Sequence, residues 1–63
     1  MKRKEYYMIV RKNGYMQPKK IKLYDSQVEK RGKYGYPYYK GHELFEELEY
    51  AEKAALKYYY AEN

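Results

Sequence analysis

The chain has 63 residues, no cysteine and one histidine, and its formal net charge is +5. A chain of this length forms one small domain, here residues 1–63, and buries only about 60% of its extended-chain surface. The absence of cysteine excludes disulfides, and a single histidine excludes the usual structural zinc ligand sets. No stretch approaches the roughly 20 apolar residues of a membrane-spanning helix, so we expect no membrane partner. We also expect no cofactor.

The charge is distributed unevenly along the chain. Residues 1–41 contain twelve Lys/Arg and three acidic residues, for a net charge of +9, whereas residues 42–63 contain two Lys and six Glu, for −4. The basic part would attract a polyanion and the acidic part would repel it, so docking onto nucleic acid would be oriented. Alternatively, the two parts pair with each other within the fold.

The N-terminal stretch MKRKEYYMIV begins with basic residues, and its apolar part ends at Arg11. This apolar part is shorter than the roughly 7–15 residues at the centre of a secretory signal. We therefore expect a cytoplasmic protein.

Residues 5–12 and 15–24 are predicted to form a β-hairpin. The first segment, EYYMIVRK, is rich in β-branched and aromatic residues. Asn13-Gly14 follows it, and this pair is the strongest short hairpin signal because both turn positions need a positive φ.

The return strand of this hairpin is predicted to lie at a sheet edge. Ile21 and Leu23 share one face of the strand, and Lys20 and Lys22 share the other. Pro18 has no backbone N–H to donate, which favours an edge position or a break in this strand.

Residues 25–32 are predicted to form a loop, and residues 33–40 a third, irregular strand that Gly35 and Pro37 interrupt. Three tyrosines alternate with these two residues, namely Tyr34, Tyr36 and Tyr38. If the glycine and the proline point toward the helix, side-chain alternation sends the three rings to the open face of the sheet. The opposite register buries the rings in the core.

Residues 42–63 are predicted to form one helix, because this segment lacks Gly and Pro and is rich in Ala, Leu, Glu and Lys. At about 100° per residue an apolar stripe emerges, made of Leu44, Leu48, Ala51, Ala55, Tyr58 and Tyr59. We expect Leu48 to be buried and the alanines to let the helix sit close to the sheet. The predicted fold is α+β: a small antiparallel sheet, formed by the N-terminal hairpin and a third irregular strand, packed by one C-terminal helix.

The residues that could carry catalysis are few, since His42 is the only histidine and Ser26 the only serine. A catalytic side chain needs a partner that tunes it. His42 and Glu46 are four residues apart and would touch on the predicted helix, but two ligands make a poor metal site. We therefore expect no enzyme and no catalytic or metal site. A small basic RNase that uses the histidine with Lys and Tyr is a remote alternative.

The stretch RGKYGYPYYKG, residues 31–41, is the predicted binding surface. Aromatic rings stack bases at about 1–3 kcal/mol each, and neighbouring Lys and Arg hold phosphates. Alternatively, several of these rings belong to the core, because Ile, Leu and Val total only eight residues. The candidate residues for contact with nucleic acid or another partner are Arg31, Lys33, Tyr34, Tyr36, Tyr38 and Lys40, together with Lys20 and Lys22 of the hairpin.

Residues 31–38, RGKYGYPY, are similar to the basic, glycine and aromatic motif of RNA-recognition domains. Lys33 is an insertion in that motif, and Pro37 replaces an aliphatic residue. The chain is also too short for the four strands and two helices of that family. Neither its fold nor its binding residues are therefore expected here.

The small size, the lack of cysteine and the abundance of Tyr, Lys and Glu resemble the small accessory proteins of phages and archaeal viruses. This resemblance implies an inhibitor of a host protein or nucleoprotein in the host cytoplasm, as in anti-CRISPR proteins, and it assigns no residue roles. The two leading functions are thus sequence-independent binding of DNA or RNA and inhibition of a host factor. Homodimerisation would stabilise so small a chain in either case.

Overall fold

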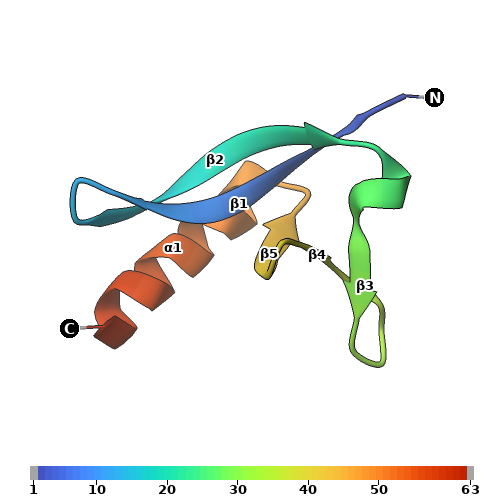
Figure 1. Ribbon diagram of the computed structural model, residues 1–63. Coiled ribbons are helices and arrows are strands. Elements are labelled where there is room, and N and C mark those ends of the chain that lie inside the picture. Colours follow the sequence, from blue (N-terminus) through green and yellow to red (C-terminus); the bar gives the residue numbers. More distant parts are fainter. Residues whose placement is uncertain (1, 63) are drawn as a thin grey trace.

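The computed structural model describes residues 2–62 of the chain. Its elements are β1 (Lys4–Lys12), β2 (Tyr15–Leu23), the 3-10 turn η1 (Asp25–Gln27), β3 (Glu29–Arg31), β4 (Tyr36–Tyr39), β5 (His42–Phe45) and α1 (Leu48–Glu62) (Figure 1). The five strands form one antiparallel sheet in the order β2-β1-β5-β4-β3. The predicted α+β fold, an antiparallel sheet packed by one C-terminal helix, is confirmed. Within residues 2–62 no helix is both long and apolar enough to cross a membrane.

The predicted N-terminal hairpin is present, and its turn has the expected geometry. Asn13 and Gly14 have φ values of 53° and 82°, so both turn residues adopt the positive φ that the sequence signals. β2 is an edge strand, as predicted from Pro18, which lies opposite Ile9 of β1.

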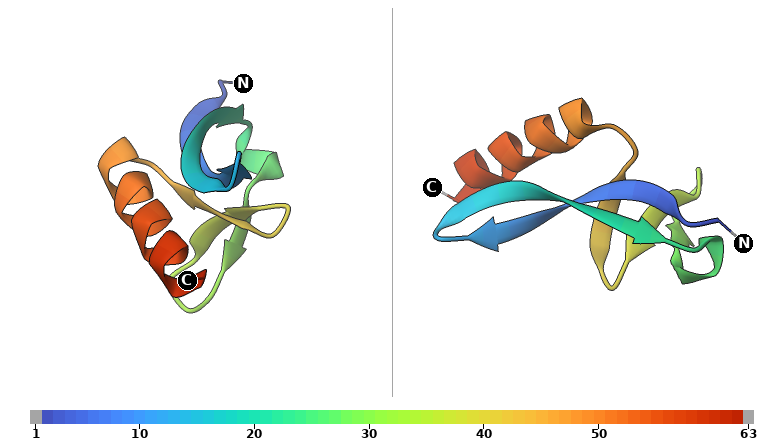
Figure 2. Two further views of the ribbon diagram at one scale, coloured as in Figure 1. Left: turned by 90° about the vertical axis from the view of Figure 1, so that its left-hand side faces the viewer. Right: turned by 90° about the horizontal axis from the view of Figure 1, so that it is seen from above.

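The helix and the β3–β4 hairpin diverge from the long β1–β2 hairpin in different directions. Figure 2 shows α1 running along β1 and β2 on one side of the sheet, while β3 and β4 extend beyond it. β1 pairs with β5 through Tyr7 and Met8 alone, so the two strands part after a short contact. This leaves the β4 and β3 end of the sheet beside the helix rather than beneath it.

The sheet has a small core on each face. On the face toward α1, Ile9 packs with Ala51 and Ala55, which are 0% and 5% exposed. The small alanines let the helix approach the sheet closely, as predicted. On the other face, Tyr6 packs with Leu23 and Leu44. Tyrosine is thus part of the core, because the chain has few aliphatic residues to fill it.

The helix is shorter than the sequence predicts. It begins at Leu48, whereas His42–Phe45 form β5, a strand that pairs with both β4 and β1. Good helix formers lose here to tertiary pairing, because Leu44 is buried to 3% exposure between the other strands. The prediction that Leu48 is buried is also wrong, since this residue lies at the start of α1 and is 44% exposed.

The segment before β5 also differs from its prediction. The predicted loop 25–32 contains η1 and the short strand β3, and the predicted third strand 33–40 is divided by a turn. The N–H of Gly35 donates a 3.2 Å hydrogen bond to the carbonyl of Gly32, which closes this turn. Both glycines have positive φ, 77° and 67°, so they reverse the chain and make β3 and β4 a second hairpin.

Candidate nucleic-acid and partner interfaces

Tyr36 and Tyr38, two of the predicted site residues, point toward the α1 side of the sheet. Tyr38 lies opposite Glu43 in the β4–β5 register, and Glu43 accepts a hydrogen bond from Tyr58 of α1. Pro37 therefore faces away from the helix, contrary to the register that would open the tyrosines to the other face. The rings are not buried either, because α1 lies along β1 and β2; Tyr36 is 52% exposed.

Two groups of side-chain contacts form on the β3–β4 hairpin. Arg31 lies 2.7 Å from Glu29 and 4.7 Å from the centre of the Tyr38 ring. Tyr34 is 75% exposed in the turn and meets Tyr36 edge to face, with ring centres 6.0 Å apart. The structure therefore brings Arg31 and Tyr38 together, and Tyr34 and Tyr36, whereas Lys40 lies by Tyr39 on the other face; at least two of the rings reach solvent.

Lys20 and Lys22 lie apart from this hairpin. They are on β2, at the opposite edge of the sheet from β3. Each Nζ is 4.0 Å from a carboxylate oxygen of Glu5, so the two lysines share one acidic partner on the α1 side. The predicted set of basic residues is thus divided between two edges.

The strand register reveals a separation of charge that the sequence analysis missed. The strands contain three carboxylates, those of Glu5, Glu29 and Glu43, and all three lie on the face toward α1. Glu5 lies four residues before Ile9 in β1, so it shares the face of the helix-side core. Glu29 lies opposite Tyr38, which is on the same face. The other face of the described strands has no acidic residue.

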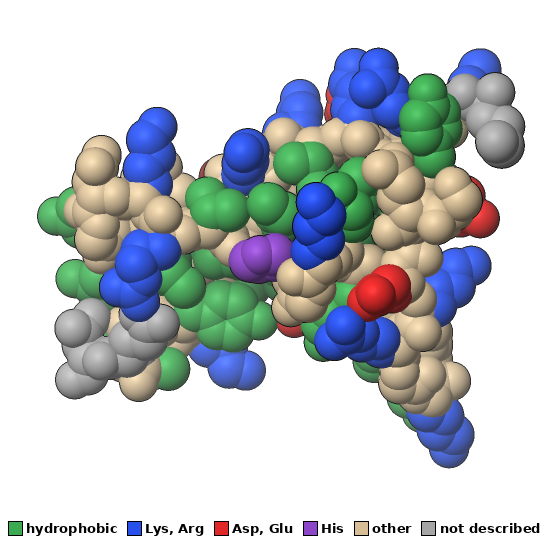
Figure 3. All heavy atoms as spheres, in the orientation of Figure 1, with side chains coloured by type: hydrophobic (Ala, Val, Ile, Leu, Met, Phe, Trp, Pro, Cys, Tyr) green, Lys and Arg blue, Asp and Glu red, His purple; other side chains and the backbone are tan. Residues whose placement is uncertain are grey.

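Exposed lysines occupy this other face, which we call the basic face: Lys19, Lys30 and Lys40. Lys19 lies opposite Met8 of the core on that side, and Lys40 lies 5.2 Å from the ring centre of Tyr39. Figure 3 has the orientation of Figure 1, so α1 is also in view, and it shows blue side chains around the histidine. If residues 42–45 had been interpreted as a strand, the alternation of side chains along the strands would have predicted the basic face.

No family model matches this chain, and no curated protein or solved structure is significantly similar to it.

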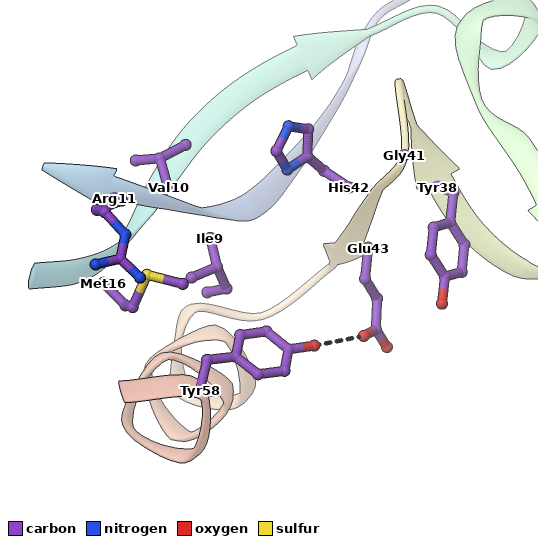
Figure 4. A pocket seen from close by; sticks show the side chains of 9 residues that line it. All are labelled: Ile9, Val10, Arg11, Met16, Tyr38, Gly41, His42, Glu43 and Tyr58. Carbon is purple, nitrogen blue, oxygen red and sulfur yellow. Dashed lines mark hydrogen bonds between the residues drawn. The ribbon is translucent and has the colours of Figure 1, made fainter. Parts of the chain in front are cut away.

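A pocket of about 480 Å³ opens where β1 and β5 part, between these strands and α1 (Figure 4). Tyr58 points at Glu43 and donates a 3.1 Å hydrogen bond to it, with Tyr38 beside them. Burial, and then the hydrogen bond to Glu43, raise the pKa of the Tyr58 phenol above its usual 10.0. The phenol thus stays a neutral donor to the carboxylate at physiological pH.

His42 points to the other side of β5 from Glu43 (Figure 4). The prediction that it touches Glu46 on a helix is wrong, because His42 is in a strand and Glu46 instead pairs with Lys4. Glu46 raises the pKa of the Lys4 ammonium through this hydrogen bond. In the part of the chain that the structure describes, no group of three His, Asp or Glu side chains forms a candidate metal site.

The ion pairs test whether the basic and acidic parts of the chain neutralise each other. The Lys4–Glu46 pair joins the two parts. The other pairs of residues 2–62 with known partners, such as Arg31–Glu29 and Lys53–Glu49, stay within one part. None of these pairs involves Lys19, Lys30 or Lys40 of the basic face.

Proposed function

We propose that this protein is a non-enzymatic module that binds DNA or RNA largely independently of base sequence. The distribution of carboxylates carries the proposal. The basic face has lysines and no strand carboxylate, whereas all three strand carboxylates lie on the face toward α1, beside Lys20, Lys22 and Arg31. A surface with one sign of charge attracts the phosphate backbone and orients the encounter. The helix side would then face away from the nucleic acid.

The phosphate contacts of this proposal come from Lys19, Lys30 and Lys40, which are exposed on the basic face. Lys33, exposed in the β3–β4 turn, extends the charged surface toward the stretch predicted from the sequence. Contacts to phosphate position a protein without reading bases. This accounts for the expected lack of sequence choice.

A charge reversal on the basic face tests the proposal. We expect Lys19→Glu/Lys30→Glu to bind a fluorescent single-stranded oligonucleotide at least about tenfold more weakly than the unchanged protein. Its affinity should also fall less steeply with salt, because fewer phosphates are neutralised. The control is Lys53→Glu/Lys57→Glu on α1, which changes the net charge equally and should lose much less affinity.

Two results would contradict nucleic-acid binding by this face. One is an equal loss of affinity in both double variants, which would mean that net charge alone attracts the oligonucleotide. The other is binding that does not change with salt, because phosphate contacts are salt-dependent.

The orientation of the polar residues supports a non-enzymatic function. His42 and Glu43 are adjacent in β5 and project to opposite faces, so they do not form an acid–base pair. We expect His42→Ala to keep full oligonucleotide binding. Cleavage of RNA by the purified protein, abolished by this substitution, would instead support the remote RNase alternative.

A second candidate function, inhibition of a host protein or nucleoprotein in the manner of viral accessory proteins, is favoured by an apolar groove of about 450 Å³ between β2 and α1. Its large side chains are 36–71% exposed: Tyr15, Leu56, Tyr59 and Tyr60. Exposed tyrosine and leucine surfaces are typical of protein interfaces. A pull-down from host cytoplasm would support this candidate over nucleic-acid binding if the captured protein stays bound after nuclease treatment and is not captured by Leu56→Glu.

A further inference from the structure

A second cleft, of about 520 Å³, lies between the β4–β5 end of the sheet and the start of α1. We call it the acidic cleft, because three glutamates and three tyrosines are among its lining residues: Glu43, Glu46, Glu47, Tyr34, Tyr36 and Tyr50. Its described lining contains no Lys or Arg. In its lining, Tyr36 and Glu43 belong to the helix side of the sheet, and Pro37 and Leu44 to the other side.

The aromatic walls of the acidic cleft are solvent-exposed. Tyr34, Tyr36 and Tyr50 are 75%, 52% and 57% exposed. A Cβ added at Gly32 would lie 3.4 Å from the Tyr36 ring, so the turn backbone supports this ring from behind. The faces of tyrosine rings attract cations, and Lys33 and Lys53 already lie 5.9 and 5.8 Å from the centres of the Tyr34 and Tyr50 rings.

The charge of the acidic cleft is negative. Glu46 is paired with Lys4, but Glu43 accepts only a neutral phenol among its described partners, and Glu47 makes no ion pair within residues 2–62. Glu43 and Glu47 thus have no ion-pair partner among the described residues, while Lys33 lies near the Tyr34 ring and Lys53 is itself paired with Glu49. The N-terminus of α1 opens here and contributes about half a positive charge, which does not offset the two carboxylates. Phosphate is repelled from such a cleft, and a cation is attracted.

We propose that the acidic cleft binds an arginine side chain presented by a protein partner. A planar guanidinium stacks on a tyrosine ring and forks onto a carboxylate, whereas a lysine ammonium does neither as well. The protein contains an internal instance of this arrangement, since Arg31 lies between the Glu29 carboxylate and the Tyr38 ring. The chain would then hold nucleic acid on the basic face and an arginine-bearing protein in the acidic cleft.

Short peptides test this inference without knowledge of the natural partner. We expect a labelled peptide of alternating Arg and Ser to bind in fluorescence anisotropy, the Lys version to bind more weakly, and the Glu version not to bind. Glu43→Gln/Glu47→Gln should weaken the Arg peptide about tenfold. The control Glu5→Gln/Glu49→Gln removes the same charge outside the cleft and should have little effect.

The aromatic part of the cleft is tested by Tyr34→Ala, with Tyr60→Ala as the control, because the two rings are similarly exposed at 75% and 71%. Only the Tyr34 variant should lose Arg-peptide affinity. Both cleft variants should bind oligonucleotide as their controls do, so that failure of this inference and failure of nucleic-acid binding are distinguishable.

Three outcomes would overturn the inference. The first is equal peptide binding by the cleft variants and their controls. The second is oligonucleotide binding lost specifically in the cleft variants, which would mean that the rings stack bases. The third is self-association in sedimentation velocity that Glu43→Gln/Glu47→Gln abolishes, which would make a second copy of this chain the occupant.

Discussion

Tyr58 in α1 donates a 3.1 Å hydrogen bond to Glu43 in β5, and this contact joins the second half of the helix to the middle strand of the sheet. It lies where β5 has already separated from β1. The hydrogen bond therefore attaches the helix to β5 at a point where β5 is paired with β4 but no longer with β1.

Removal of this hydrogen bond should destabilise the fold modestly. We expect Tyr58→Phe to lower the free energy of unfolding by about 1 kcal/mol, the usual net value of one hydrogen bond. Denaturant unfolding followed by circular dichroism measures it. Tyr50→Phe is the control, because Tyr50 is 57% exposed, and its loss should be much smaller. Equal effects of the two substitutions would contradict a structural role for the Tyr58 hydroxyl.

The same contact predicts a dependence of stability on high pH. Burial and the bond to Glu43 raise the pKa of Tyr58 above 10.0, whereas in the unfolded chain the phenol titrates at its usual value. The stabilisation of the neutral phenol is fully present below pH 10 and is lost as the pH rises through the raised pKa. Above pH 10, the unfolding midpoint of the unchanged protein should fall more steeply than that of Tyr58→Phe. Parallel curves would count against this assignment.

The turn of the first hairpin should tolerate asparagine and reject valine at position 14. Gly14 has a φ of 82°, which costs a residue with a Cβ roughly 1–2 kcal/mol and a β-branched residue more. No atom lies within 4 Å of an added Cβ, so the cost is conformational rather than steric. Thermal melting of Gly14→Val and Gly14→Asn compares the two; similar melting temperatures would be inconsistent with a strained turn.

Packing between helix and sheet should depend on Ala51 and not on Leu48. Ala51 is 0% exposed, so Ala51→Leu overpacks the interface and should cost about 1–3 kcal/mol. Leu48 is 44% exposed, and Leu48→Ala should cost less than the roughly 2–5 kcal/mol of a buried leucine. Urea unfolding of both variants, with Ala61→Leu at an exposed helix position as a control, decides between them. A larger loss in the Leu48 variant would reverse this view of the interface.

The Arg31 side chain should contribute to the stability of the fold, so its role in binding must be measured apart from this contribution. Its contacts with Glu29 and the Tyr38 ring are half-exposed and worth about 0.5–1 kcal/mol. Arg31→Gln should therefore lower the melting temperature slightly, while Lys33→Gln, in the turn beside it, should not. If both melt like the unchanged protein, Arg31 does not brace the β3–β4 hairpin.

The sequence by itself determined the elements whose signals are local. Asn13-Gly14 requires positive φ at both positions, and this specified the first hairpin and its register. Pro18 has no N–H for a ladder, and this placed β2 at an edge. The alanine spacing in the last segment likewise indicated which face of α1 approaches the sheet.

Only the tertiary structure decided the rest, because nonlocal pairing overrode local propensity. His42–Phe45 has the composition of a helix, yet it becomes the strand between β1 and β4, since Leu44 then fills the core opposite α1. This pairing places Glu43 on the face of Glu5 and Glu29, so that the opposite face of the described strands carries lysines without a carboxylate. It also turns Tyr36 toward the helix side without covering it. No local signal in residues 31–41 encodes that orientation, which depends on the strand that follows.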